Sequence, residues 1–251
     1  MVVYNRIWCT KRCLESIKDL GQPITLINNG SDYKPFLKWL KTQPYPVWEF
    51  PKIHCAKDLW RHINIAVRIY KKRNGPIDAY VMTDPDIELE NSHLPWIETM
   101  YKVLMTHPRV NALSPSLRID DIPDYYPLKK RAIGSEGGKT CSFIDCWGPW
   151  FTDKNGLRMR RAHVDTTFSM YRPNFNKKQV TRKAIRLAEP YIARHLDWYL
   201  DPKNLTKDQI AYFKASGRVT HFGGPRFKRK MNEKKKKKRR AMNEKKKKRL
   251  T

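Results

Sequence analysis

The chain has 251 residues, a formal net charge of +28 and a hydrophobic content of 40%. This length accommodates one α/β domain or two small ones, and the apolar and aromatic content excludes a chain that is disordered throughout. No apolar run approaches the roughly 20 residues of a membrane-spanning helix.

The charge is distributed unevenly along the chain. Residues 226–251 contain sixteen Lys or Arg and two acidic residues, and the 225 residues before them carry an equal net charge of +14. We therefore predict a moderately basic folded domain at 1–225 and a low-complexity Lys/Arg-rich tail at 226–251 that is disordered on its own. Such a tail is suited to nonspecific contact with a polyanion or a membrane surface.

The five cysteines are odd in number and lack C-x-x-C spacing, which disfavours a zinc site or a disulfide framework and favours free thiols in a reducing compartment. The first residues lack the charged and apolar regions of a signal peptide. We therefore expect a cytoplasmic protein, which would lie in the host cytoplasm if the chain is viral. The cysteines are Cys9, Cys13, Cys55, Cys141 and Cys146.

The first part of the sequence alternates between short apolar segments and segments with helical spacing. Apolar residues recur every three or four positions in 57–72, and 79–82 is apolar throughout, as in a central parallel strand. The resulting order of strands and helices indicates a mostly parallel central sheet with flanking helices. The predicted strands are 2–4, 23–27, 47–50 and 79–82, and the predicted helices are 11–20 (with Thr10 as N-cap), 33–41 and 57–72.

The rest of the sequence is less regular. The segment 118–126 is a loop dense in carboxylates, and Thr206 is a good N-cap for the last helix. The expected elements are a helix at 96–107, strands at 110–114, 139–150 and 162–171, an irregular or helical segment at 184–194, and a helix at 207–215.

Two carboxylates follow the predicted strand 79–82, at the kind of strand end where open α/β sheets bind ligands. Asp84 and Asp86 flank Pro85, and residues this close can share one hard divalent cation with phosphate oxygens. Asp-Pro-Asp is by itself an ordinary turn sequence. Its place after an apolar strand, with no other D-x-D in the chain, favours a metal site.

Asparagines end the first two predicted strands. Asn5 follows the first strand, and Asn28 and Asn29 follow the second. Amides donate and accept hydrogen bonds, which suits recognition of a base or ribose. The same residues are equally typical of a turn with left-handed backbone, so both interpretations stay open.

Two further carboxylates are candidates for general-base work or acceptor binding. Asp121 lies in the loop 118–126, where a solvated loop with a local ion pair is at least as good an explanation. Asp165 lies in a strand-like apolar stretch, where a carboxylate is either hydrogen-bonded structure or a site residue.

His195 lies downstream of these carboxylates and is a candidate third metal ligand, with His221 as the fallback. A lone histidine is more often structural or exposed, so this assignment depends on context. Nearby aromatic rings are candidates for stacking against sugars, although core packing is the commoner fate of such rings. They are Trp147, Trp150, Trp198 and Tyr199.

Four blocks occur in this order: Tyr80-Val-Met-Thr-Asp-Pro-Asp86, Ser116-Leu-Arg-Ile-Asp-Asp-Ile-Pro123, Asp165-Thr-Thr-Phe-Ser-Met-Tyr171 and Arg194-His-Leu-Asp-Trp-Tyr199. Together they resemble a family of bacterial and large-DNA-virus glycosyltransferases of the GT-A fold, which includes chlorella-virus enzymes that glycosylate capsid protein. The D-x-D alone is generic, and the four blocks together are much more specific. The resemblance spans roughly 2–216 and leaves out the basic tail.

The resemblance implies a single GT-A (Rossmann-like) α/β domain that uses a nucleotide-sugar donor, with a UDP-sugar favoured over a GDP-sugar, and Mn²⁺ or Mg²⁺. It implies a glycan or glycoprotein acceptor. On the family pattern Asp86 binds the metal directly, Asp84 contacts the ribose or the metal through water, and His195 completes the metal site. The nucleotide would lie against Asn5, Arg6, Asn28 and Asn29, and Asp121 or Asp165 would face the acceptor.

Two other functions compete with this one. A nucleic-acid-binding protein could act through the basic tail, although the sequence shows no zinc finger, no RNA-recognition signature and no basic helix inside the folded part. A metal-dependent nuclease or phosphotransferase also uses clustered carboxylates, often around two metal ions. An isolated D-x-D with one distant histidine suits a single-metal site better.

Overall fold

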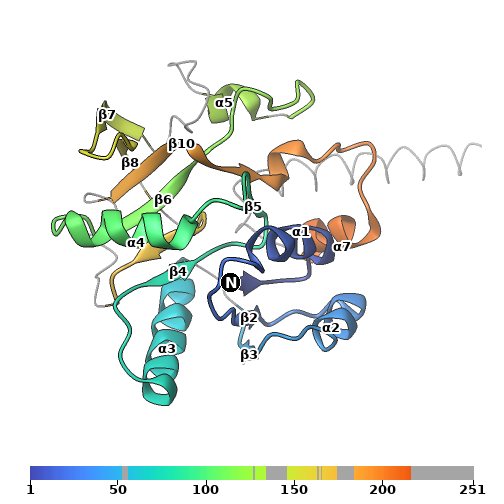
Figure 1. Ribbon diagram of the computed structural model, residues 1–251. Helices are drawn as coiled ribbons and strands as arrows, with labels where there is room; N and C mark the ends of the chain where they lie inside the picture. The colour runs from blue at the N-terminus through green and yellow to red at the C-terminus, as the bar shows by residue number, and fades with distance from the viewer. Residues whose placement is uncertain are drawn as a thin grey trace, which may run out of the picture.

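The computed structural model describes residues 1–52, 56–126, 128–133, 146–162, 164, 166–173 and 184–215. They form a mixed α/β domain with a small parallel sheet and a larger mixed sheet (Figure 1). The predicted basic tail lies outside these residues. No helix in the described ranges is long and apolar enough to cross a membrane.

The small sheet has the parallel order β1-β2-β3, and helices connect its strands as the sequence predicted. The helix α1 starts at Ile7, earlier than expected, because Thr10 does not cap it: the Thr10 hydroxyl donates instead to the Arg6 carbonyl inside the first turn. The elements are β1 (Val2–Val3), α1 (Ile7–Ile17), β2 (Leu26–Asn29), α2 (Lys34–Leu40) and β3 (Val47–Phe50).

The larger sheet has the order β4-β9-β6-β10-β8-β7, and β5 pairs with β10 beside this path. Among its described strand pairs only β6 and β10 run parallel, so the expectation of a mostly parallel central sheet is wrong for this sheet. Its strands are β4 (Tyr80–Met82), β5 (Ile87–Leu89), β6 (Ala112–Leu117), β7 (Cys146–Thr152), β8 (Arg158–Ala162), β9 (Ser169–Tyr171) and β10 (Ala184–His195).

The strand β10 corrects the expectation of an irregular or helical segment at 184–194. It pairs with β5, β6 and β8, so it is the central strand of the larger sheet. The sequence signal for a strand was weak because Pro190 has no amide hydrogen to donate to a neighbouring strand. The pairing of β10 with β6 shifts register between Leu187 and Ile192, on either side of this proline.

The two sheets meet at β1 and β4. The Val2 amide donates to the Thr83 carbonyl over 3.2 Å, so the first strand lies beside the end of β4. This contact places the carboxyl ends of β1 and β4 next to each other, and with them Asn5 and the Asp84–Asp86 turn.

Of the remaining helices, α4 packs on β6 and β9, and α7 lies beside α1 (Figure 1). Thr206 caps the last helix as expected: its amide donates to the Gln209 side chain and its hydroxyl accepts from the Gln209 amide. The expectation of no basic helix in the folded part is wrong, because α3 carries six basic residues and one acidic residue. The helices are α3 (Ala56–Asn74), α4 (Trp96–Thr106), α5 (Lys129–Ile133), the 3-10 helix η1 (Leu196–Tyr199) and α7 (Lys207–Ala215).

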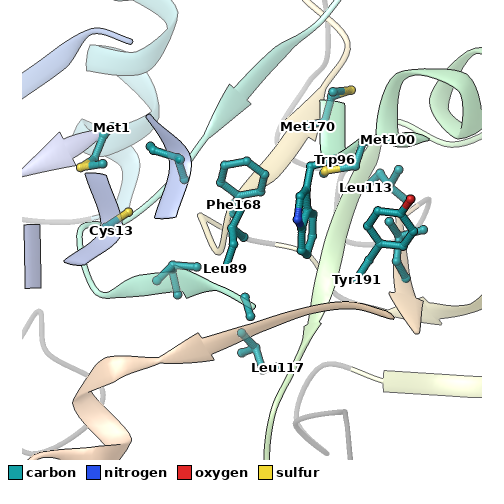
Figure 2. Close-up of a cluster of buried hydrophobic side chains, with 14 of the residues drawn as sticks. Met1, Cys13, Leu89, Trp96, Met100, Leu113, Leu117, Phe168, Met170 and Tyr191 are labelled. Carbon is teal, nitrogen blue, oxygen red and sulfur yellow. The ribbon is translucent and has the colours of Figure 1, made fainter. Parts of the chain in front are cut away.

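Trp96 of α4 lies in the main core, which extends from α4 and the larger sheet to Met1 and Cys13 beside the small sheet (Figure 2). Its ring is fully buried and packs edge-on against Tyr191 at 5.1 Å and Phe168 at 6.0 Å between centroids. Leu89 of β5 belongs to the same cluster. Burial of side chains this large contributes about 1.5–3 kcal/mol each, which holds β5, and the turn before it, in place.

Gly30, in the turn after β2, gives a test of local packing. Its φ is +60°, and a Cβ there would lie 2.6 Å from the Lys52 amide nitrogen. Gly156 has φ +82° and open space around its Cβ position. Gly156→Ala should lower the free energy of unfolding by about 1–2 kcal/mol through backbone strain alone. Gly30→Ala should lower it by about 1–3 kcal/mol more, because its Cβ also meets the Lys52 backbone. Urea denaturation checks this, and equal losses would contradict it.

Candidate functional site

Asp84 lies in the turn between β4 and β5 and is held against the segment that precedes β9. Its amide donates to the Thr166 carbonyl over 2.7 Å, and its carboxylate accepts the Thr166 hydroxyl. Cys13 approaches the Asp84 carbonyl with its sulfur at 3.7 Å. The backbone of the D-x-D turn is therefore fixed from two sides by residues distant in sequence.

Asp86 and His195 lie side by side at the ends of β5 and β10. The register pairs Ile87 with His195, and the Leu196 amide donates to the Asp86 carbonyl over 2.7 Å. The Asp86 Oδ2 lies 3.8 Å from the His195 Nδ1, and both side chains are buried. The His195 ring stacks on Trp198 with centroids 5.0 Å apart and planes 6° from parallel. Two residues proposed as metal ligands from the sequence are thus brought together.

Arg6 occupies the centre of this site. Its guanidinium donates to Asp86 Oδ2 over 2.8 Å and to Asp197, residues 80 and 191 positions away in sequence. The guanidinium carbon lies 4.2 Å from the centroid of the Tyr212 ring, which comes from α7. Arg6 therefore ties together the exit of β1, the start of β5, η1 and the last described helix.

Burial and charge oppose each other in this cluster. Burial lowers the pKa of Arg6, but Asp197, Cys9 and Asp86 raise it well above its usual value. Burial raises the pKa of Asp86, and His195 and Arg6 outweigh burial and hold that pKa below its usual value. Burial prevails at Asp197 and raises its pKa. Asp86 is thus the more acidic carboxyl of the two.

Sequence reasoning missed two members of the cluster. Asp197 lies inside the block Arg194–Tyr199, so its position two residues after His195 was the available signal. Tyr212 had no distinguishing signal, because one tyrosine in a short helix is typical of core packing. Its phenol is buried, which is the first cause of its raised pKa.

The predicted nucleotide-binding asparagines hold the loops together in this structure. Asn5 is fully buried with φ +52°, and its side chain bonds the Asp32 carboxylate at 2.5 Å and the Asp32 and Tyr33 amides at 3.0 Å. Asn28 donates to Glu49 over 2.7 Å. Both amides therefore fit the turn-forming interpretation, and Asn29 ends β2 half-buried beside them.

Asp121 lies on the rim, in a network of arginines and a tyrosine. It accepts from the Tyr199 hydroxyl over 2.6 Å and pairs with Arg194 at 2.5 Å, and Arg194 also pairs with Glu90 at 2.8 Å. Glu90 in turn bonds Arg118 through both carboxylate oxygens. These contacts agree with the interpretation of the loop as a site of local ion pairs, and the network also includes Arg194 of β10.

Burial raises the pKa of Asp121, but hydrogen bonds from Tyr199 and Arg194 outweigh burial and lower it. We expect carboxyl NMR titration to place this pKa below the ordinary value of about 3.9, and Tyr199→Phe to raise it. The stability contributed by this depressed pKa is present above that ordinary value and is lost as pH falls through the folded-state pKa. An unchanged pKa in Tyr199→Phe would contradict the assignment.

Several sequence candidates lie elsewhere or outside the described residues. Asp165 and His221 fall outside them, so their roles stay predictions. Trp198 is buried under His195 and serves the core. Trp150 of β7 is half-buried, and the Arg158 guanidinium lies 4.8 Å from its ring centroid, away from the D-x-D turn in sequence and in sheet order.

The donor set fits a divalent cation in part. One ion with ligand bonds of about 2.1 Å can span the 3.8 Å between Asp86 Oδ2 and His195 Nδ1. Arg6 bonds the same Asp86 oxygen, and among the described residues no group of three His, Cys, Asp or Glu side chains is arranged to hold a metal. Further ligands would be water, oxygens of a bound diphosphate, or Asp84 after a movement of its turn.

In comparisons with protein-family models and with curated proteins, the sequence matches none of them. The structure itself therefore provides the basis for any functional conclusion.

Proposed function

We propose that this chain is a metal-dependent glycosyltransferase that moves a sugar from a nucleotide diphosphate donor, a UDP-sugar being favoured, to a glycan or protein-linked glycan. The observation that carries the proposal is the pair Asp86–His195, which β5 and β10 hold 3.8 Å apart. A carboxylate and an imidazole at the ends of adjacent strands, two residues from a second carboxylate, suit one Mn²⁺ or Mg²⁺.

The arrangement of strands supports the GT-A likeness. The parallel β1-β2-β3 sheet continues through the Val2–Thr83 contact toward β4, and the D-x-D turn follows β4 directly. Asp84 and Asp86 therefore lie beside the carboxyl ends of β1 and β4, the kind of strand end at which open α/β sheets bind ligands.

The chain's own residues prepare this site in three ways. Asp86 and His195 would hold the cation, with Asp84 beside them, and the bound cation would neutralise charge on the leaving diphosphate. His195 and Arg6 keep Asp86 ionised, because together they outweigh burial and hold the pKa of that carboxyl low. Asp121 and its arginine partners form a polar rim that would face the acceptor.

Calorimetric titration of UDP and GDP, each with and without Mn²⁺, tests the proposal on the full chain. We expect one nucleotide to bind in a metal-dependent manner, followed by slow hydrolysis of the matching sugar donor when acceptor is absent. Binding of neither nucleotide under any condition would remove the basis for the glycosyltransferase assignment. Cleavage of nucleic acid without donor hydrolysis would favour a nuclease.

A further inference from the structure

A second charged surface lies on α3, away from the D-x-D turn. Arg61, Arg68 and Lys72 are exposed, and their spacing of seven and four positions places them on one line along the helix. At about 1.5 Å per residue the line is roughly 16 Å long. Arg73 is exposed beside its end, with its guanidinium 5.7 Å from the Trp48 ring centroid.

The opposite face of α3 is used by the fold. Ile63 and Ala66 are buried, and His62 packs on Phe50 with ring centroids 4.9 Å apart. The same side of the helix borders an apolar cavity of about 580 Å³ that Tyr70 also lines. Figure 1 shows α3 at the periphery, below β4. The exposed side chains of α3 are therefore basic or amide side chains, and Ile65 and Ile69 are half-buried.

The charges on this line are little neutralised within the protein. Arg61 approaches Asp58 at 3.8 Å, and the Arg61 side chain is 66% exposed. Within the described ranges neither Arg68 nor Lys72 forms an ion pair. Like charges four positions apart destabilise an isolated helix slightly, so the stability of α3 gives no reason for this pattern.

We propose that the outer face of α3 binds the phosphodiester backbone of a nucleic acid. Arginine forks match phosphate geometry, and two of the three aligned residues are arginines. A membrane surface suits the face less well, because peripheral helices insert apolar side chains. The exposed large hydrophobic residues of the described chain are Tyr101 and Tyr125, neither of them on α3.

The contact is therefore purely electrostatic. Such contacts gain most from the release of counterions, which a nucleic acid supplies at high density along its length. Binding along α3 is independent of the proposed sugar transfer, since none of the aligned residues belongs to the Asp86 cluster.

The test uses the full chain and a short fluorescent DNA duplex, with affinity measured by anisotropy over a salt series. The triple variant Arg61→Gln, Arg68→Gln, Lys72→Gln should give a slope of log affinity against log salt that is shallower by about 2–3. The matched control Lys41→Gln, Lys102→Gln, Arg109→Gln removes three exposed charges from other elements and should leave the slope unchanged.

Three results would overturn the proposal. Equal slopes for wild type and both variants would assign binding to the basic tail alone. Equal losses in the two variants would show a dependence on total charge. Loss of binding to phosphatidylserine-containing vesicles, with DNA binding intact, would show that α3 faces a membrane. Nucleotide titration of the triple variant should match wild type, which separates this surface from the donor site.

Discussion

Arg6→Met should lower the free energy of unfolding by about 3–5 kcal/mol at neutral pH, because it leaves two buried carboxylates without their cation. Arg6 is 4% exposed and bonds both Asp86 and Asp197. Methionine keeps much of the side-chain length, so the loss reports charge more than volume. Urea denaturation measures it.

Arg12→Met is the matched control. Arg12 also forms a bidentate pair, with Glu88, but its side chain is 46% exposed, so the loss should stay below about 1 kcal/mol. Similar losses in the two variants would show that burial does not set the strength of the Arg6 cluster.

The pH dependence of Arg6→Met gives a second readout. Burial already raises the pKa of Asp197 in wild type, and removal of the guanidinium, the strongest opposing charge, should raise it further above the unfolded value of about 3.9. The folded variant then takes up protons before the unfolded chain does, so its free energy of unfolding should rise as pH falls from 7 toward 4. A free energy of unfolding that falls in Arg6→Met as pH is lowered over this range would contradict this account.

Local sequence pattern was sufficient for elements whose signals lie within a few neighbouring residues. The strand 47–50 and the helix 207–215 have the predicted bounds, and the amphipathic pattern of 57–72 marks α3. These signals arise within a few neighbouring residues, through periodicity and capping. The same segment contains the basic line of α3, which the net charge of the whole domain does not reveal because that sum does not distinguish one helix face from another.

Pairing between strands that are distant in the sequence could not be predicted from such local patterns. The strand β10 lacks strand-like continuity at Pro190, and its identity comes from partners in β5, β6 and β8. The cluster around Arg6 likewise depends on contacts across 80 and 191 positions. Asp86 and His195 could be proposed as ligands of one metal from their context and from the family resemblance, whereas Tyr212 had no signal at all.

Asp86→Asn should weaken metal-dependent nucleotide binding by at least about 100-fold, because loss of even an outer-shell partner of a metal commonly costs 10–100-fold. Asparagine keeps the shape of the side chain and an oxygen that can accept from Arg6. Arg6 also retains Asp197, so the fold should survive. Calorimetric titration with Mn²⁺ and the nucleotide that binds wild type measures the loss.

Asp121→Asn is the control, because it makes the same change at a carboxylate whose side chain is 41% exposed and paired with Arg194 on the rim. Its nucleotide affinity should equal that of wild type. If Asp86→Asn binds nucleotide and metal as wild type does, Asp86 serves only as a partner of Arg6. If both variants lose binding equally, the effect follows from loss of negative charge near the site. If only Asp86→Asn loses binding, this carboxylate belongs to the donor site. The ion pair with Arg6 alone would not make nucleotide binding depend on Mn²⁺.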